Sequence, residues 1–410
     1  MWTKFLDQFL AQFLRHGTLD VVLPDGQTRS YGDGSQPRMA VHLHDADLPR
    51  KLVLRPDLAL GEAYMDGRLT VEGDDIATLL ALLVTNRSAQ PALWWRKPLD
   101  KAADWLRVLN QINPVGRSLR NVSHHYDLTP ELYALFLDRD RQYSCAYFAQ
   151  PDDTLEAAQA QKKALIAAKL CLEPGMRVLD IGCGWGGLAL TLAREHQVKV
   201  LGITLSKEQL AIAQARARAE GLAKRVEFRL ADYRTLQGQF DRIVSVGMFE
   251  HVGLPHYRTY FGQVRKLLTE NGVALLHTIG NAGPPMATGA WIRKYIFPGG
   301  YIPSMSECLR AIEAEDLWTT DVEVWRLHYA ETLSHWRERF EANIDKARAL
   351  HDDRFCRMWR YYLAGSEMTF RHAKQCVFQF QLARRLDAVP LTRDYLMGAG
   401  RAPMPMRRGA

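Results

Sequence analysis

The sequence predicts an α/β protein in which a smaller α/β domain precedes a doubly wound parallel sheet. Helical and strand patterns alternate between about residues 121 and 385, which is the rhythm of parallel strands joined by crossover helices. One buried strand runs into a glycine turn and a helix start at 178–187, as in sheets that bind a ligand at the carboxyl ends of their strands. The length of 410 residues allows two or three domains.

Composition narrows the class of protein. Hydrophobic residues make up 47% and charged residues 24% of the chain, which argues against a disordered chain, a fibrous repeat and a disulfide-stapled scaffold. The six cysteines form no CxxC pair and no secretory leader is visible, so we expect a cytoplasmic protein with neither disulfides nor a metal site. No apolar run approaches the roughly 20 residues that span a bilayer. The net charge of +7 permits nucleic acid or anionic lipid as a partner.

Residues 1–90 are expected to form the smaller domain. A helical apolar stripe opens it, with phenylalanine at 5, 9 and 13 and leucine at 6, 10 and 14. Strand-like runs follow at 41–43 and 51–54, and an apolar helical stretch covers 76–84.

A basic aromatic segment follows at 91–120, where tryptophans alternate with lysines and arginines. Trp105, Leu109 and Ile112 would share one face of a helix. Such a linker helix can pack between domains or lie in the interface of a bilayer, and both interpretations stay open. At the other end of the chain, residues 394–410 are rich in Gly, Pro, Met and Arg and are expected to form a flexible tail.

Residues 121–393 are expected to form the larger domain. The patterns predict a helix at 188–194 and strands at 177–181, 199–203, 226–230, 241–246 and 272–278. Ser206 can cap the next helix, in which Leu210, Ala213 and Ala217 recur at helical spacing.

The glycine turn at 182–187 is the first candidate site. Gly182 and Gly184 allow a ligand to approach the backbone closely, although turns of this kind also bind NAD. Asp180 stands two residues before the first glycine of the turn and favours a ligand that carries positive charge, such as the ammonium and sulfonium of S-adenosylmethionine. The end of the second strand carries Thr204, whereas a dinucleotide site prefers an acidic residue there.

Longer motifs make the interpretation specific. DIGCGWG at 180–186, GITLSKEQ at 202–209, ADYR at 231–234 and SVGMFEHVG at 245–253 resemble the cyclopropane-fatty-acyl-phospholipid synthases and their mycolic acid relatives. HHYDLTPELYALFLD at 124–138, YSCAYF at 143–148, LLHTIG at 275–280, WIRKYIFPGGYIPS at 291–304 and the stretch 361–384 are similar to the same family. AYMDGRLTVEGDD at 63–75 resembles the extra N-terminal domain of the phospholipid-acting synthases, so the resemblance covers nearly the whole chain.

The resemblance implies a fold and a set of cofactor residues. The fold is that of a class I S-adenosylmethionine-dependent methyltransferase, with a lipid-associated or membrane-associated domain at 1–90 and the catalytic domain at 121–393. The family pattern places Gly182 and Gly184 under the methionine part of the cofactor, next to Asp180. It places Thr204 and Gln209 at the ribose, Asp232 near the adenine, and Tyr143 and Ser144 over the ligand.

The resemblance also implies a bound bicarbonate ion as the base that closes a cyclopropane ring. Its residues map to Cys145, Glu250, His277, Ile279 and Tyr329. His277 and Tyr329 can donate hydrogen bonds to the anion, Ile279 would do so through its backbone N–H, and Cys145 is a weak donor. Glu250 would accept the proton of the bicarbonate hydroxyl, because an unshared carboxylate would repel the ion.

The implied reaction converts cis double bonds of unsaturated phospholipids at the membrane surface into cyclopropanes. It implies a cytoplasmic enzyme on the inner face of the membrane, without a nucleic-acid partner, and a homodimer is one possible state. Three alternatives stay open: a methyl-branched or methylene product, a nucleic-acid or small-molecule methyltransferase, and a lipid carrier without activity. The retained Asp180, Cys145, Glu250, His277 and Tyr329 argue against the carrier.

Overall fold

The computed structural model describes residues 1–88, 111 and 129–397. Contacts divide the chain into two compact units. Unit 1 comprises Met1–Arg107, Ala287–Pro298 and Ala330–Gln375, and unit 2 comprises Val108–Met286, Gly299–Tyr329 and Cys376–Ala410. The predicted linker helix at 91–120 lies outside the described residues, except for Gln111. In the described parts of the chain, no helix combines the length and the apolar character that a membrane span requires.

Unit 1 contains a small sheet of order β2-β1-β3-β4. β1 (Thr18–Val22) pairs antiparallel with β2 (Thr28–Gly32) and parallel with β3 (Arg38–Leu43), and β4 (Leu69–Val71) pairs antiparallel with β3. The helices of this region are α1 (Trp2–Phe13), α2 (Leu48–Leu54), α3 (Pro56–Met65) and α4 (Ile76–Ser88), with a 3₁₀ turn at Glu72–Asp74. Leu6 and Leu10 of α1 enter the core, whereas Phe5 on the next face is 48% exposed.

The prediction of a strand at 51–54 is wrong, because these residues end helix α2. Pro49 in the first turn of α2 presets a helical backbone angle without losing a needed hydrogen bond, and Leu48 is buried while Leu54 is 57% exposed. A short apolar run of this kind does not distinguish a strand from a helix by its pattern alone.

Later segments of the chain complete unit 1. They are α12 (Ala290–Tyr295), α15 (Ile344–Leu350), α16 (Asp353–His372) and α14 (His328–Ala342) from Ala330 onward. α16 packs against α3 and α4, and its Ala364 and Met368 belong to the same hydrophobic core as Leu6 and Leu10. Residues 287–298 and 330–375 thus belong to the same unit as the N-terminal sheet. The division predicted from the sequence instead placed them in the larger domain at 121–393.

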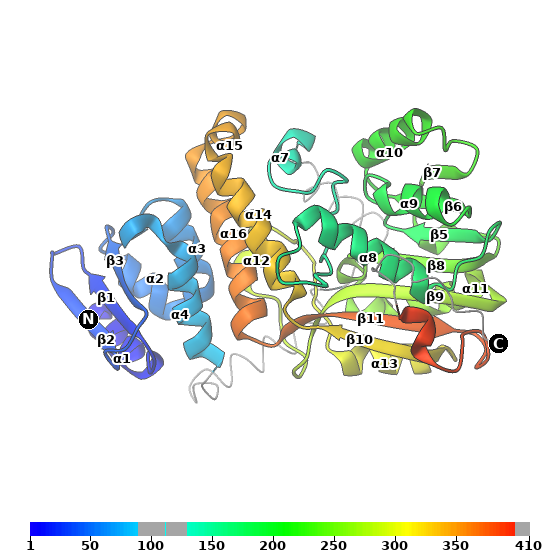
Figure 1. Ribbon diagram of the computed structural model, residues 1–410. Helices are drawn as coiled ribbons and strands as arrows, with labels where there is room; N and C mark the ends of the chain where they lie inside the picture. Colours follow the sequence, from blue (N-terminus) through cyan, green and yellow to red (C-terminus); the bar gives the residue numbers. More distant parts are fainter. Residues whose placement is uncertain (89–110, 112–128, 398–410) are drawn as a thin grey trace. The chain divides into compact units, whose positions relative to one another are not determined.

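Unit 2 contains a seven-stranded sheet of order β10-β11-β9-β8-β5-β6-β7 (Figure 1). Its strands are β5 (Arg177–Ile181), β6 (Lys199–Thr204), β7 (Val226–Leu230), β8 (Phe240–Val246), β9 (Leu268–Asn281), β10 (Trp318–Trp325) and β11 (Gln375–Ala383). The five strands from β7 to β9 are parallel neighbours, and β10 runs antiparallel to β11. The strand order reverses beside β5, so the ends of β5 and β8 form the switch point where α/β sheets bind ligands.

Helices cover both faces of this sheet. α8 (Leu155–Lys169), α9 (Gly187–Glu195) and α10 (Lys207–Ala219) share one core with residues of β5 to β9. α11 (Tyr257–Leu267) and α13 (Met305–Glu313) share another core on the opposite face. Shorter elements are α7 (Pro130–Ala134) and the 3₁₀ turns at Tyr233–Thr235, Phe249–His251, Leu254–His256 and Arg393–Leu396. The predicted doubly wound fold is confirmed.

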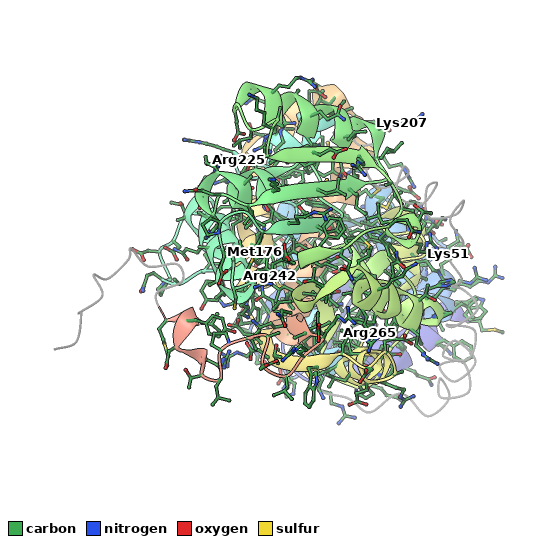
Figure 2. The ribbon with its side chains drawn as sticks, turned by 90° about the vertical axis from the view of Figure 1, so that its right-hand side faces the viewer. Lys51, Met176, Lys207, Arg225, Arg242 and Arg265 are labelled. Carbon is green, nitrogen blue, oxygen red and sulfur yellow. The ribbon has the colours of Figure 1, made fainter. Side chains whose placement is uncertain are left out.

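Buried polar contacts tie the sheet to its helices. The guanidinium of Arg242, labelled in Figure 2, donates to the carbonyl oxygens of Leu170 and Cys171, just beyond α8. Burial lowers the pKa of Arg242 because it disfavours the charged guanidinium. The two hydrogen bonds offset this cost, since a charged donor makes a stronger hydrogen bond than a neutral one. This contact joins the end of α8 to β8 and so fixes α8 along its face of the sheet.

Five predicted strands match β5 to β9, and Ser206 caps α10 by accepting from Gln209 N at 3.2 Å. The patterns did not indicate β10 and β11. The tail expected from residue 394 overlaps the 3₁₀ turn Arg393–Leu396, where the Tyr395 hydroxyl contacts Gln381. Residues 398–410 lie outside the described part of the chain.

Candidate active site

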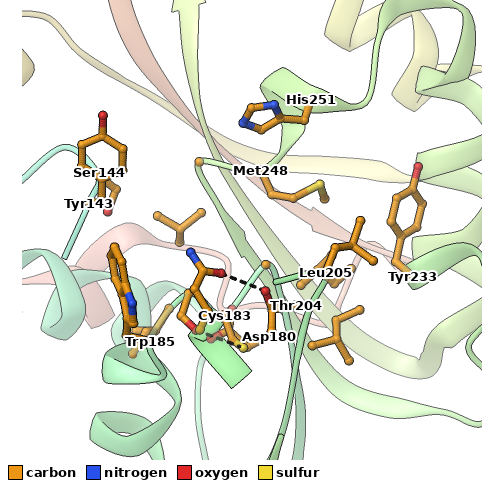
Figure 3. Close-up of a pocket in the computed structure, with 18 of the residues that line it drawn as sticks. Tyr143, Ser144, Asp180, Cys183, Trp185, Thr204, Leu205, Tyr233, Met248 and His251 are labelled. Atoms are coloured by element: carbon orange, nitrogen blue, oxygen red, sulfur yellow. Dashed lines mark hydrogen bonds between the residues drawn. The ribbon is translucent and has the colours of Figure 1, made fainter. Parts of the chain in front are cut away.

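A pocket opens at the carboxyl ends of β5, β6 and β8 (Figure 3). The turn after β5 forms its floor: the N–H groups of Gly182 and Cys183 both donate to Ile203 O at 2.9 Å. Gly182 and Gly184 have φ values of 84° and 54°, a backbone region that favours glycine. A Cβ at Gly182 would lie 2.9 Å from Met248 Cβ, whereas at Gly184 it would meet no atom within 4 Å. The backbone at Gly184 therefore faces open space in the pocket.

Asp180 lies beneath this turn at the end of β5 and is 2% exposed. Its Oδ2 has no hydrogen-bond partner among the described residues. Burial raises the pKa of the Asp180 carboxyl to about 7, because a charge out of water is costly without a partner. The pocket thus contains a buried oxygen that a cationic or hydrogen-bond-donating ligand can satisfy.

The second strand brings a polar pair to the same pocket. Thr204 at the end of β6 donates through Oγ1 to Gln209 Oε1 at 2.8 Å, and Oγ1 accepts from Ser206 N at 3.1 Å. The Gln209 amide is thereby fixed with its Nε2 away from Thr204. An amide held this way is suited to a hydroxyl-bearing ligand, because it can present a defined donor.

Asp232 follows β7 and also lines the pocket. It is paired with Arg234 at 2.6 Å and accepts from Arg234 N at 3.0 Å. This pairing orients the carboxylate next to Tyr233, another residue of the pocket.

The segment before α8 forms the remaining wall. Two residues of α8 hold it: Gln159 Nε2 donates to Ser144 O at 2.9 Å, and Lys162 Nζ donates to Ser144 Oγ at 2.8 Å and Gln142 Oε1 at 2.9 Å. Tyr143 stands against the Tyr133 ring at 5.2 Å, in an edge contact. All eight residues that the resemblance assigned to the cofactor line this one pocket, namely Tyr143, Ser144, Asp180, Gly182, Gly184, Thr204, Gln209 and Asp232.

Glu250 lies next to the pocket, in the 3₁₀ turn whose His251 lines it. Glu250 Oε1 accepts from Ile279 N at 2.7 Å, and Oε2 has no partner among the described residues. Burial raises the pKa of Glu250 to about 7, against the lowering effect of the Ile279 bond. The structure thus joins two of the five residues assigned to bicarbonate, but here the Ile279 N–H donates to Glu250.

Lys162 lies near two more of the residues assigned to bicarbonate, His277 and Cys145. His277 of β9 is 2% exposed, and its pKa is well below the usual value because of burial and the charges of Lys162 and Lys169. Cys145 is fully buried and interacts electrostatically with Lys162. Cys145 Sγ contacts Ala146 O at 3.3 Å. A lysine charge therefore acts near both the thiol and the imidazole.

Tyr329 is buried in the first turn of α14. Its neighbour His328 stacks on Tyr147 at 4.7 Å, and His328 Nδ1 accepts from Phe148 N at 3.2 Å. The start of α14 therefore lies against the segment that carries Cys145.

Sequence reasoning missed several residues of this region. Lys162 lines the pocket although it lies in an ordinary amphipathic helix, and burial lowers its pKa to about 8. Trp185 and His251 also line the pocket, and burial lowers the pKa of His251 to about 4. A charged residue on the apolar face of a helix is the signal that could have indicated Lys162, because lysine is rarely buried without a partner.

Comparison of the sequence with known proteins identifies the family of this chain. The sequence pattern of mycolic acid cyclopropane synthetase matches residues 115–380, and that of a domain of unknown function matches residues 5–90. The chain is 39% identical to a probable fatty acid methyltransferase of Pseudomonas putida over 87% of this chain and 89% of the relative. It is 38% identical to the cyclopropane-fatty-acyl-phospholipid synthase of Escherichia coli (strain K12) over 87% and 90%.

A solved structure agrees with this placement. A mycolic acid cyclopropane synthase complexed with SAH and CTAB aligns with a TM-score of 0.62 and 35% identity, over 66% of this chain and 99% of the other. The orphaned Asp180 oxygen and the open backbone at Gly184 fit a ligand with a positively charged end. The chain therefore belongs to the mycolic acid cyclopropane synthetase family of S-adenosylmethionine-dependent methyltransferases, whose substrates are fatty acyl lipids.

Proposed function

We propose that this protein forms cyclopropane rings from cis double bonds in phospholipid acyl chains, with bicarbonate as the general base. The observation that carries the proposal is the buried Glu250 carboxyl, held by the Ile279 amide directly beside the pocket of the glycine turn. The relative from Escherichia coli, named a cyclopropane-fatty-acyl-phospholipid synthase, supports the same reaction over both the N-terminal and the larger domain.

The first step needs a methyl group held against an alkene. When bound, S-adenosylmethionine supplies that methyl group. Asp180 would accept hydrogen bonds from the ammonium group, and the Thr204–Gln209 pair would position the ribose hydroxyls. Ser144, held by Lys162, would cover the ligand from the wall of the pocket. Positioning matters here because an alkene is a weak nucleophile and depends on alignment.

The second step needs a base in a dry site. Ring closure removes a proton from the carbon that came from the methyl group, and the electron pair of that C–H bond forms the third side of the ring. Glu250 Oε2 is the oxygen that would share the hydroxyl proton of bicarbonate, since its pKa of about 7 allows it to hold or release a proton. His277 and Tyr329 would donate hydrogen bonds to the ion, and Cys145 would contribute a weaker one.

The substrate lies in a membrane, so the protein must reach a bilayer surface. In α1, Trp2 and Phe5 are 37% and 48% exposed, and the Arg50 guanidinium lies 5.9 Å from the centre of the Trp2 ring. Exposed aromatic rings beside a cation suit the headgroup region of anionic lipid. We therefore assign peripheral contact with the inner face of the membrane to this part of unit 1.

A methyl-branched or methylene product is the second candidate. The name of the relative from Pseudomonas putida, a probable fatty acid methyltransferase, favours it. Both products share the methyl transfer and the cation that it creates, so they require the same pocket and the same cofactor residues. Loss of a proton from the transferred carbon either closes the ring or, after a hydride shift, leaves a methylene group, whereas a saturated methyl branch also needs a hydride from a reductant.

The test is product analysis on vesicles of unsaturated phospholipid, with bicarbonate first removed and then titrated. Cyclopropane formation that rises with bicarbonate is expected. Glu250→Gln should lower the rate by about 30- to 1000-fold, which corresponds to roughly 2–4 kcal/mol, while the affinity for S-adenosylmethionine stays unchanged. Glu227→Gln, which alters an exposed acid paired with Arg229, is the matched control. A branched chain from the wild-type protein would contradict ring formation, and rates indifferent to bicarbonate would contradict the base.

A further inference from the structure

A row of buried polar side chains leads to His277 along the face of the sheet that α8 covers. Lys169 at the end of α8, Gln379 in β11 and His277 in β9 are each 2% exposed or less. Lys169 Nζ donates to Gln379 Oε1 at 2.7 Å, and Gln379 Nε2 lies 3.0 Å from His277 Nδ1. The row therefore runs from lysine through amide to imidazole.

The strand register explains why these groups meet. Gln379 is directly opposite Glu323 of β10 in the antiparallel pair, and β11 lies between β10 and β9. Lys169 Nζ contacts both the Glu323 carboxylate and the Gln379 amide. Burial lowers the pKa of Lys169, and the contact with Glu323 opposes this effect, because opposite charges at contact favour the ionised forms.

Donor and acceptor chemistry fixes the direction of every bond in the row. An ammonium group only donates, so the amide must present Oε1 to Lys169 and Nε2 to His277. An amide nitrogen also only donates, so His277 Nδ1 must accept and cannot carry a proton. The proton of the neutral imidazole then resides on Nε2.

We propose that Lys169 and Gln379 are positioning residues that hold His277 as the tautomer with its proton on Nε2. A reversed amide would set two donors against each other at Lys169, and an unpaired donor is costly in a buried site. Packing adds to this restraint, because the Trp325 ring meets the His277 ring edge-on at 5.1 Å. His277 thereby becomes a fixed hydrogen-bond donor toward any ligand that Nε2 reaches.

This arrangement deepens the proposed function, and the identity of the ligand rests on that function. A donor on Nε2 recognises an oxyanion such as bicarbonate, whereas an acceptor there would repel it. Lys162, which is also near His277, adds positive potential and so disfavours an imidazolium. Both features favour an anion over a cation at this position.

The direct test is nitrogen NMR of the full-length protein labelled with ¹⁵N-histidine, without substrate. The chain has 13 histidines, and the signals lost in His277→Gln assign residue 277. In the wild-type protein, Nε2 should show the shift of a proton-bearing nitrogen and Nδ1 that of an unprotonated one. A proton-bearing Nδ1 in the wild-type protein would overturn the proposal.

Two variants test the row itself. Gln379→Glu places an acceptor beside Nδ1, so Nδ1 should gain a proton. Lys169→Met frees the amide to reverse, so the two nitrogen shifts should move toward a mixture of tautomers. Lys163→Met is the matched control, since it removes another paired lysine of α8, one that contacts Asp140 at 2.6 Å. Nitrogen shifts in Lys169→Met that equal those of the wild-type protein would overturn the role of Lys169. If Lys169→Met does not fold, Gln379→Glu still tests the role of the amide.

Turnover adds a separate readout. Gln379→Glu should lower bicarbonate-stimulated turnover on the order of 10²-fold, as expected for loss of one preorganised donor, with unchanged affinity for S-adenosylmethionine. If the wild-type rate does not respond to bicarbonate, the proposed base is wrong while the nitrogen shifts still decide the tautomer.

Discussion

Replacing Asp180 by Asn should stabilise the ligand-free protein at alkaline pH and weaken its binding of S-adenosylmethionine. Asp180 is buried without a partner for Oδ2 among the described residues, so its ionised form is unfavourable in the folded state. Asparagine has nearly the shape of the protonated acid but never ionises. The substitution therefore removes the cost of the charge and leaves the packing close to that of the wild-type protein.

The magnitude follows from the pKa of Asp180, which burial raises from 3.8 to about 7. This difference corresponds to roughly 4 kcal/mol of unfolding free energy when fully expressed. Below about pH 4 both the folded and the unfolded states hold the proton, so the charge costs nothing. As the pH rises from about 4 to about 7, only the unfolded state ionises readily and the wild-type protein loses stability relative to Asp180→Asn. Above about pH 7 the loss is complete.

Urea unfolding between about pH 5 and pH 8.5, without ligand, measures this effect. The gap between the variant and the wild-type protein should widen over the lower part of that range and then level off. Asp316→Asn, which alters an exposed acid paired with Arg265, should show no such widening. A gap that stays constant with pH would refute the argument, whatever its absolute size, because only the pH dependence reports the raised pKa.

Binding should change in the opposite direction. A hydrogen bond between ions contributes roughly 1.5–3 kcal/mol, so Asp180→Asn should weaken the affinity for S-adenosylmethionine by about 10- to 100-fold in calorimetry. Equal affinities would mean that the ammonium group binds elsewhere in the pocket.

Three further perturbations test other parts of the site. Gly184→Val should abolish binding of S-adenosylmethionine, because a branched side chain would enter the open pocket from a backbone at φ 54°. Wild-type affinity in calorimetry, from a variant with a native circular dichroism spectrum, would contradict this. Lys162→Met should weaken binding of S-adenosylmethionine by about 10-fold or more, because Ser144 Oγ and Gln142 Oε1 lose their shared donor; an unchanged dissociation constant would show that the wall of the pocket does not need it. Replacing both Trp2 and Phe5 by Ser should reduce sedimentation with anionic vesicles by about 10-fold or more, whereas Trp318→Ser, at a tryptophan 53% exposed in unit 2, should not; equal effects of the two changes would place the membrane contact elsewhere.

The sequence predicted the larger domain well where the chain alternates locally between strand and helix. β5 and β7 match their predicted bounds, because a buried strand between a turn and a helix start gives a clear pattern. It did not predict β10 and β11, which are separated by the helices of unit 1. Pairing between such distant segments depends on tertiary contacts that local patterns do not carry.

The pocket shows the same division. The glycine turn, Thr204 and Asp232 follow the ends of successive parallel strands, so their convergence at one edge of the sheet follows from the fold. Lys162, Lys169 and Gln379 have no such pattern. Their importance depends on which atoms face each other across helices and strands, as in the contact of Lys162 with Ser144, and only coordinates give this information.

Burial shifts the pKa values of the titratable groups in this site toward their neutral forms, whereas the proposed ligands carry full charges. Burial raises the pKa values of Asp180 and Glu250 to about 7 and lowers that of Lys162 to about 8, while His277 is held neutral. A permanently ionised pair of carboxylates would attract the cationic cofactor but exclude an anion, and a permanently charged imidazolium would do the reverse. Groups whose pKa values lie near neutrality can instead adjust when each ligand arrives, since the ligand's charge replaces the missing partner. The proposed two-step chemistry needs a cation and an anion close together, and this set of buried, weakly charged groups is suited to admit both.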